Sequence, residues 1–457
     1  MIRIAKEKIF DFFKRGNERT ILTKKNIAAS FGIKGVTILI SLILIPMTIE
    51  YVGKERNGIW LTLYSMVLWL NLFDIGFGNG LKNKLAEAKA EAKVELAQKY
   101  ISSTYAIISL ICLAIFALFC LINPYLNWLK ILNVPAVYEY EVSGLVWIFI
   151  ISFCFTFVLN LLKSIVAADQ RPAIGSFMDM IGQIITLAGI FILSKTASPS
   201  LISLGLITGF SPVIVFIAAN FVLFNGRYKK WKPVIRAVDF KLAKNLMNLG
   251  IQFFIATCAS FLVTQTLPFL IQRMTNPVEV TNYNTAFRLF SLAFNVLAII
   301  IIPYWSSFTD AYAQKDYAWM QKSISYLHKL FVWLLICQAI LLVLSPAIYY
   351  LWVNFWLKDP IDISFFMSLA VCLNVCVLCW LNISIYPING IGKIKLQVYC
   401  SLAEMVLLIP IAIWMGHQWS APGIILAPVL ISIPRMIWAP IQLDKLIKNK
   451  ATGIWNK

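Results

Sequence analysis

Two polar stripes cross otherwise apolar stretches of this sequence, and each stripe contains one cation. The first includes Lys34 and Ser41, and Ser30 and Thr37 complete it at helical spacing. The second repeats that spacing with Asn284, Arg288, Ser291 and Asn295. Residues three, four or seven positions apart share one face of an α-helix. The stripes therefore predict a polar wall that presents positive charge to an anionic ligand.

A second interpretation of the two cations stays open at the level of sequence. Long basic side chains near a helix end can extend to the membrane surface and keep their charge in water. Lys34 and Arg288 each lie close enough to the end of an apolar segment to do so. A charge in mid-membrane costs about 2.5–3.5 kcal/mol on insertion scales, so by default it faces a cavity or a partner. We favour the cavity.

Three carboxylates also lie inside or at the ends of apolar segments: Asp74, Asp179 and Glu404. Each is a candidate for ion coupling or gating, by binding a proton or Na⁺. For Asp179 and Glu404 the alternative is a hydrogen bond between helices. For Asp74 the alternatives are an ion pair with Lys34 and exposure to water at a helix end.

Residues suited to enzyme chemistry are few. His328 and His417 are the two histidines, and neither has a carboxylate at helical spacing. Cys372, Cys376 and Cys379 share a helix face that would suit a soft metal, but the sequence offers no second ligand cluster. No phosphate-binding loop motif is present. We expect no catalytic residue, no metal site and no cofactor.

The composition indicates that membrane helices position these residues. Of the 457 residues 60% are hydrophobic and 13% charged, and the mean hydropathy is +0.78. Soluble domains have about 45–50% apolar and about 25% charged residues. The surplus apolar surface must face lipid, which excludes a soluble enzyme, a disordered chain and a disulfide-bonded secreted domain. The net charge of +19 is spread between apolar segments, so we expect no nucleic-acid partner.

Twelve apolar segments approach the roughly 20 residues that a helix needs to cross a bilayer. The sequence therefore predicts an all-α, polytopic membrane protein with two six-helix bundles around a central cavity. The predicted spans are 27–50, 57–81, 100–122, 143–166, 173–194, 200–224, 249–272, 283–308, 327–352, 364–386, 396–416 and 420–441.

The basic residues predict the orientation, because cytoplasmic connections are enriched in Lys and Arg. They concentrate in the connections that lie inside when both termini are cytoplasmic. The two halves open with similar short sequences, which indicates a parallel repeat. The predicted parts are a basic amphipathic N-terminal segment, an N-terminal lobe, a basic linker, a C-terminal lobe and a cytoplasmic tail, at 1–26, 27–224, 225–248, 249–441 and 442–457.

Several motifs together resemble a known family. The stretch 51–60 reads YVGKERNGIW and 72–81 reads LFDIGFGNGL, while Asn282-Tyr283 and 302–308 (IPYWSSF) mark the second half. This pattern resembles the Wzx-type O-antigen flippases, the polysaccharide branch of the multidrug/oligosaccharidyl-lipid/polysaccharide exporter superfamily. Asn282 departs from the pattern, since many relatives have glycine there.

The resemblance implies a V-shaped molecule that moves an undecaprenyl-diphosphate-linked oligosaccharide, such as an O-antigen repeat unit, across the bacterial inner membrane. Transport would run from the cytoplasmic to the periplasmic leaflet by alternating access. The resemblance places Lys34 and Arg288 on the helices beside the lateral opening, in contact with the diphosphate. Besides this lipid and the bilayer, a polysaccharide polymerase and the chain-length machinery are implied as candidate partners.

Two alternatives stay open. An ion-coupled multidrug or cation antiporter of the same superfamily should favour acidic residues in its cavity, and Lys34 and Arg288 count against it. A membrane-embedded glycan polymerase should carry a large external loop with catalytic residues, whereas the longest predicted external segment is 123–142. We therefore expect a transporter and no enzyme.

Overall fold

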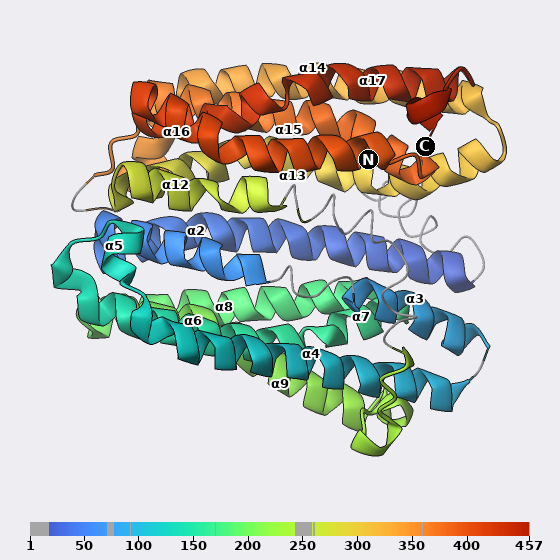
Figure 1. Ribbon diagram of the computed structural model, residues 1–457, viewed down its shortest axis with the longest axis horizontal. Helices are drawn as coiled ribbons and strands as arrows, with labels where there is room; N and C mark the ends of the chain where they lie inside the picture. The colour runs from blue at the N-terminus through green and yellow to red at the C-terminus, as the bar shows by residue number, and fades with distance from the viewer. Residues whose placement is uncertain are drawn as a thin grey trace, which may run out of the picture. The chain divides into compact units, whose positions relative to one another are not determined.

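The computed structural model describes residues 18–70, 77–91, 93–169, 171–242, 258, 261–355, 357 and 360–456. Over these ranges the chain is helical and contains no β-strand (Figure 1). Nine stretches of the described residues are long and apolar enough to cross a membrane as helices. The predicted all-α, multi-pass membrane fold is confirmed.

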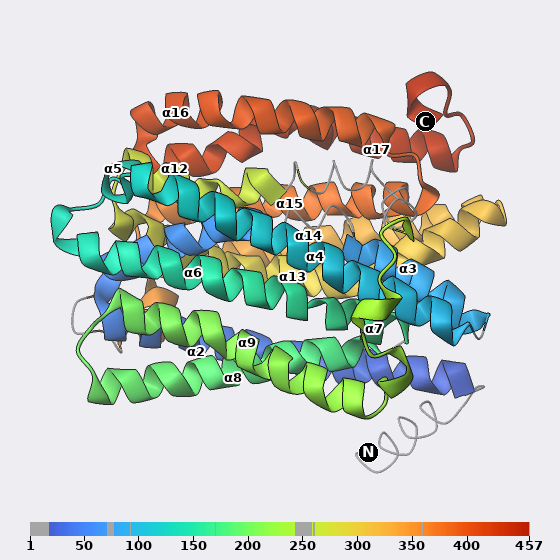
Figure 2. The ribbon, with the colours of Figure 1, turned by 60° about the horizontal axis from the view of Figure 1, so that its bottom comes forward.

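One compact unit combines residues from 1–47, 73–126 and 144–249. Within it, α8 packs along α9, and α3 packs against both α4 and α7. The long helices α4, α6, α8 and α9 run roughly along one direction (Figure 2). Besides the first part of α2 (Glu18–Leu68) and most of α6 (Glu139–Leu159), this unit holds α3 (Phe77–Ala90), α4 (Val94–Ile122), η2 (Asn123–Tyr125), α7 (Leu161–Ala168), α8 (Pro172–Thr196), α9 (Leu201–Asn225), η4 (Lys229–Trp231) and η5 (Ile235–Ala237).

The second compact unit combines residues from 48–72, 127–143 and 250–457. Its centre is α15, which packs along α13 and also contacts α14, α16 and α17. Phe290, Val371 and Val375 are fully buried in this core. Besides the later part of α2, the unit holds α5 (Trp128–Leu132), η3 (Ala136–Tyr138), α12 (Leu267–Met274), α13 (Pro277–Ala313), α14 (Tyr317–Tyr349), η6 (Tyr350–Asn354), α15 (Phe365–Ile391), α16 (Lys395–Ile431), α17 (Ile433–Ile447) and η7 (Gly453–Asn456).

Two of the helices contain a break where the sequence predicts a turn between spans. In α2 the break is at Gly53, whose φ of 81° is in the left-handed region that glycine adopts at little cost. In α16 it is at Trp419 and Ser420, and Ser420 has a φ of 52°. Part of the predicted span 249–272 lies outside the described residues. The total of twelve crossings and the two six-helix bundles therefore stay predictions.

The two units do not follow the order of the chain. Residues 48–72 and 127–143 belong to the second unit, although segments of the first unit flank them in sequence. Of the predicted N-terminal segment, 1–17 lies outside the described residues, and α2 begins at Glu18. The predicted lobe limits stay a prediction.

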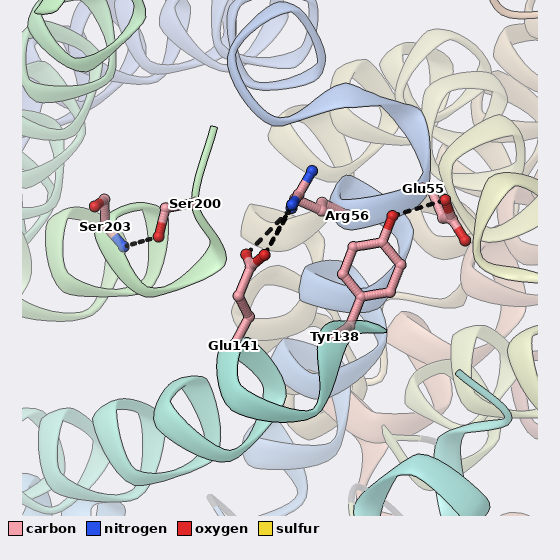
Figure 3. A network of polar contacts seen from close by, with 6 residues as sticks. All are labelled: Glu55, Arg56, Tyr138, Glu141, Ser200 and Ser203. Atoms are coloured by element: carbon pink, nitrogen blue, oxygen red, sulfur yellow. Dashed lines mark hydrogen bonds and ion pairs between the residues drawn. The ribbon is translucent and has the colours of Figure 1, made fainter. Parts of the chain in front are cut away.

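A polar network holds 127–143 against the second segment of α2 (Figure 3). The Arg56 guanidinium donates to both carboxylate oxygens of Glu141, at 2.8–3.1 Å. The Tyr138 hydroxyl donates to Glu55 at 2.8 Å, and its ring lies 5.1 Å from the Arg56 guanidinium. A bidentate Arg–carboxylate pair fixes both distance and angle. This network gives a local reason why the two segments belong to one unit.

The basic stretch after α9 is attached to α4. The backbone N–H of Val234 donates to the Ser102 hydroxyl at 3.1 Å, and that of Asp239 donates to the Ser103 hydroxyl at 2.8 Å. Both serines are buried. The described part of the predicted linker is therefore packed on the first unit through hydrogen bonds that serine side chains accept.

Candidate functional site

The predicted stripe on α13 forms one face of that helix within the second unit. Arg288 and Asn295 are exposed and Asn284 is half-buried, whereas Phe290 and Leu297 on another face are buried. The Asn284 amide donates to the backbone oxygen of Val280 at 3.0 Å. No carboxylate in the described part of the chain forms an ion pair with Arg288. Its charge is thus available to a ligand on this face.

The stripe on α2 belongs to the first unit. Lys34 is exposed, and Ser41 is half-buried with its hydroxyl donating to the backbone oxygen of Ile38 at 2.8 Å. The cation of each stripe is therefore exposed on a membrane helix, Lys34 in the first unit and Arg288 in the second. Contact of either cation with a diphosphate stays a prediction.

Of the three predicted carboxylates, two can be placed. Asp179 on α8 forms an ion pair with Lys163 on α7, at 2.6 Å between Nζ and Oδ1, and it is partly exposed. Glu404 on α16 is buried and is described below. Asp74 lies outside the described residues. A role in ion coupling stays a prediction for all three.

Glu404 is bound by Arg435 of α17. The Arg435 Nε donates to Oε1 of Glu404 at 2.8 Å, and its Nη2 donates to the other carboxylate oxygen and to the Ser401 hydroxyl at 3.1 Å. The two side chains are each 9% exposed. Arg435 lies near the end of the predicted span 420–441, but its side chain does not extend to the protein surface. The buried carboxylate of Glu404 holds the guanidinium inside the unit instead, because a buried charge needs a hydrogen-bonded partner.

This ion pair forms part of the wall of a cavity of about 440 Å³ inside the second unit. The wall comes from α12, α15, α16 and α17 and includes residues next to α12. Four amide side chains contribute polar groups to it: Asn374, Asn382, Asn389 and Gln397. None of these amides belonged to the predicted site, although Asn374, Asn382 and Asn389 recur at seven- and eight-residue intervals within one apolar segment.

A charged cluster around Asp169, between α7 and α8, was also missed. Its carboxylate is 5% exposed and accepts from Lys89 of α3, from Arg227 at 2.9 Å and from Tyr228 at 3.0 Å. Arg171 adds a further contact at 3.6 Å. The sequence signal was a lone Asp two residues before Arg171 in the short connection 167–172. The cluster joins α3, the α7–α8 turn and the end of α9.

Asp169 gives the first unit an acid-sensitive element. Burial acts to raise the pKa of this carboxyl, but the hydrogen bonds from Lys89, Arg227 and Tyr228 hold the pKa below its ordinary value of 3.8. A group whose pKa is lowered by folding stabilises the fold above the unfolded value and loses that effect as the pH falls through the folded value.

Asp169→Asn is therefore expected to lower the free energy of unfolding at pH 7 by about 1.5–3 kcal/mol, the range for hydrogen bonds to charged groups. It should also reduce the loss of stability between pH 5 and about pH 3. Thermal melts of the purified protein across this range measure both effects. Glu91→Gln is the control, because Glu91 is 55% exposed and its ion pair with Lys93 lies at the surface. Equal melting midpoints for wild type and Asp169→Asn would contradict the assignment.

The sequence can now be compared with known proteins. Residues 23–309 match the profile of a family described as polysaccharide biosynthesis protein. The match covers more than half of the 457 residues. The chain belongs to this family.

Two curated relatives agree with this family membership. A protein of Yersinia pseudotuberculosis, named as a candidate O-antigen export protein, is 22% identical over 93% of this chain and 97% of the relative. A candidate O-antigen transporter of Salmonella typhi is 21% identical over 61% of this chain and 63% of its own length. The match to the Salmonella protein thus spans less than two thirds of that relative.

Solved transporter structures share the fold of this chain. An inward-facing multidrug resistance transporter of the MATE family, in the MOP superfamily, matches with a TM-score of 0.76, 13% identity and coverage of 93% of this chain and 100% of the other. The lipid II flippase MurJ, in its inward closed conformation, matches with a TM-score of 0.72, 14% identity and coverage of 92% and 90%. At these identities the likeness shows the fold.

Proposed function

We propose that this protein is a flippase that moves an undecaprenyl-diphosphate-linked oligosaccharide, such as an O-antigen repeat unit, from the cytoplasmic to the periplasmic leaflet by alternating access. The observation that carries the proposal is the polar face of α13, where Arg288 is exposed on an apolar, membrane-length helix. The family match and the O-antigen relatives support the choice of substrate.

The chemistry of the substrate matches this face. A diphosphate needs cations, and the planar guanidinium of arginine donates two parallel hydrogen bonds to phosphate oxygens. Asn284 and Asn295 flank Arg288 with amides that bind hydroxyl or phosphate oxygens. Lys34 and Ser41 offer similar groups on α2. The polyprenyl chain stays in the bilayer, where it needs no polar site.

The charges inside the helices favour a flippase over a cation antiporter. An antiporter for cationic drugs needs an acidic site. The two predicted carboxylates in the described part of the chain are instead paired with cations, Asp179 with Lys163 and Glu404 with Arg435. The exposed charges of the two stripes are Lys34 and Arg288. The comparisons with named transporters also favour transport over glycan polymerisation.

The setting follows from the same proposal. The protein would reside in the bacterial inner membrane with both termini in the cytoplasm, where the basic connections belong. A polymerase and chain-length machinery would consume the exported unit. A proton or Na⁺ gradient would drive the cycle, with Asp74, Asp179 and Glu404 as the candidate coupling residues.

Single substitutions of the two exposed cations test the proposal. Arg288→Ala and Lys34→Ala should each lower export of the lipid-linked glycan about tenfold or more, since a charged hydrogen bond contributes about 1.5–3 kcal/mol. Proteoliposomes with the fluorescently labelled lipid-linked substrate measure the rate, with and without a pH or Na⁺ gradient. Arg288→Lys should recover part of it.

Lys329→Ala is the matched control, because Lys329 is an exposed cation on the membrane helix α14 outside either stripe. It should transport at the wild-type rate. Full transport by both Arg288→Ala and Lys34→Ala would remove the diphosphate site. Rates that do not respond to either gradient would remove ion coupling.

A further inference from the structure

The cavity of the second unit is large enough for a small ligand. Its volume of about 440 Å³ is within the range of small-molecule pockets, about 300–1,000 Å³. A single water takes up about 30 Å³ in the liquid. The residues that line the cavity come from both the apolar and the polar classes, as in pockets that orient a ligand by a few hydrogen bonds.

Two oxygen atoms of the cavity-lining side chains have no hydrogen-bond partner among the described residues. They are Oδ1 of Asn389 and Oε1 of Gln397, and both atoms are buried. Gln397 as a whole is 8% exposed. Buried polar atoms of native proteins nearly always have a partner, and leaving one unpaired is costly. The two oxygens are acceptors, so the missing partner is a hydrogen-bond donor.

The other two amides are held in place by the backbone. The Asn374 amide nitrogen donates to the backbone oxygen of Ile425 at 3.1 Å, and that of Asn382 donates to the backbone oxygen of Leu378 at 2.6 Å. Each of these amides keeps its oxygen and a second N–H as further polar groups. Amides fixed in this way can both accept from and donate to the hydroxyl groups of a ligand.

The charge of the wall indicates whether the ligand that donates these hydrogen bonds is charged or neutral. Glu404 and Arg435 are the charged residues that line the cavity in the described part of the chain, and they neutralise each other. A buried cation requires an uncompensated carboxylate, and a buried phosphate requires an uncompensated cation. A neutral ligand with several hydroxyl groups satisfies the acceptors without adding charge. Tyr386 adds an aromatic surface for the ring of such a ligand.

We infer that this cavity binds a neutral sugar ring, and that the four amides with the Glu404–Arg435 pair are the polar part of its wall. The choice of ligand rests on the proposed function, in which the ring is one pyranose of the lipid-linked oligosaccharide. The cavity thereby recognises sugar within the second unit, separately from the diphosphate contacts assigned to Lys34 and Arg288.

Thermal melts of the purified full chain in lipid nanodiscs test the inference. The probes are glucose, galactose, mannose, rhamnose, N-acetylglucosamine and N-acetylgalactosamine. Each sugar is titrated to about 100-fold above the lowest sugar concentration that shifts the melting temperature. At least one sugar should raise the melting temperature of wild type in a saturable way. Asn389→Leu and Gln397→Leu should each weaken its apparent Kd at least tenfold. Without sugar, both variants should melt cooperatively at or above the wild-type temperature, because each loses an unpaired buried acceptor.

Gln338→Leu is the matched control. Gln338 is a buried amide of the same unit with an unpartnered Oε1 among the described residues, and it does not line the cavity. It should keep wild-type sugar affinity. The inference is overturned if no sugar shifts the wild-type melt, which indicates water alone in the cavity. It is also overturned if replacing choline with Na⁺, or adding pyrophosphate, shifts the melting temperature of wild type and both Asn389→Leu and Gln397→Leu abolish that shift. Free-sugar binding does not depend on transport, so full transport by Lys34→Ala and Arg288→Ala would leave it standing.

Discussion

Arg435→Met is expected to lower the free energy of unfolding by about 3–5 kcal/mol, the cost of removing one partner of a buried ion pair. Glu404 would stay in a site where it is 7% exposed, with its charge uncompensated. Its carboxylate would lose its two hydrogen bonds from the guanidinium and retain no nearby cation among the described residues. Chemical unfolding of the purified protein in mixed micelles measures the change.

A double substitution separates the effect of pairing from that of packing. Glu404→Gln combined with Arg435→Met removes both charges and should recover most of the loss, since replacing both partners of a buried pair is often close to neutral. Lys448→Met is the control at the end of the same helix, because Lys448 and Asp444 form an exposed pair, 50% and 58% accessible. Exposed pairs contribute about 0–1 kcal/mol. Equal losses for Arg435→Met and Lys448→Met would contradict the burial argument.

Gly58→Ala is expected to destabilise the protein by about 3 kcal/mol or more, at or beyond the usual cost of overpacking. A Cβ added at Gly58 would lie 1.7 Å from the backbone oxygen of Pro277, so a helix backbone would have to move. The neighbouring contacts fix the approach: the Asn57 amide donates to the Thr281 hydroxyl at 3.2 Å, and that hydroxyl donates to the backbone oxygen of Lys54 at 2.7 Å. Melting temperature and membrane protein level report the loss.

Gly32→Ala provides the matched control in the same helix. A Cβ at Gly32 would meet nothing within 4 Å. The substitution should be neutral or stabilise α2 by about 0.5–1 kcal/mol, because alanine favours helix over glycine. If Gly58→Ala melts as Gly32→Ala does, α2 and α13 do not approach through Gly58. The close approach gives a physical reason for the glycine in the motif at 51–60.

Local patterns in the sequence were sufficient to predict much of the fold. Runs of apolar residues predicted the long helices, and the breaks at Gly53 and Ser420 lie where the sequence indicated turns. The spacing of Asn284, Arg288 and Asn295 predicted one helix face. In the structure Arg288 and Asn295 are exposed on that face and Asn284 is half-buried. These features depend on residues within a few turns of each other, which is why they can be read without a structure.

Contacts between distant segments could not be predicted in this way. Asp169 meets Lys89 and Arg227, which are 80 and 58 positions away in the chain. Arg435 pairs with Glu404 across 31 residues, and Gly58 lies against Pro277. Neither the hydropathy of these positions nor their spacing indicates a partner.

The sequence by itself determined an all-helical membrane chain, the location of most helices and the polar faces with their cations, because hydropathy and helical periodicity are local properties. Only the tertiary structure decided which charges are neutralised, which amides surround a cavity and where a glycine is required. Those outcomes depend on which helix faces pack together, and many pairings of apolar faces would bury a similar area.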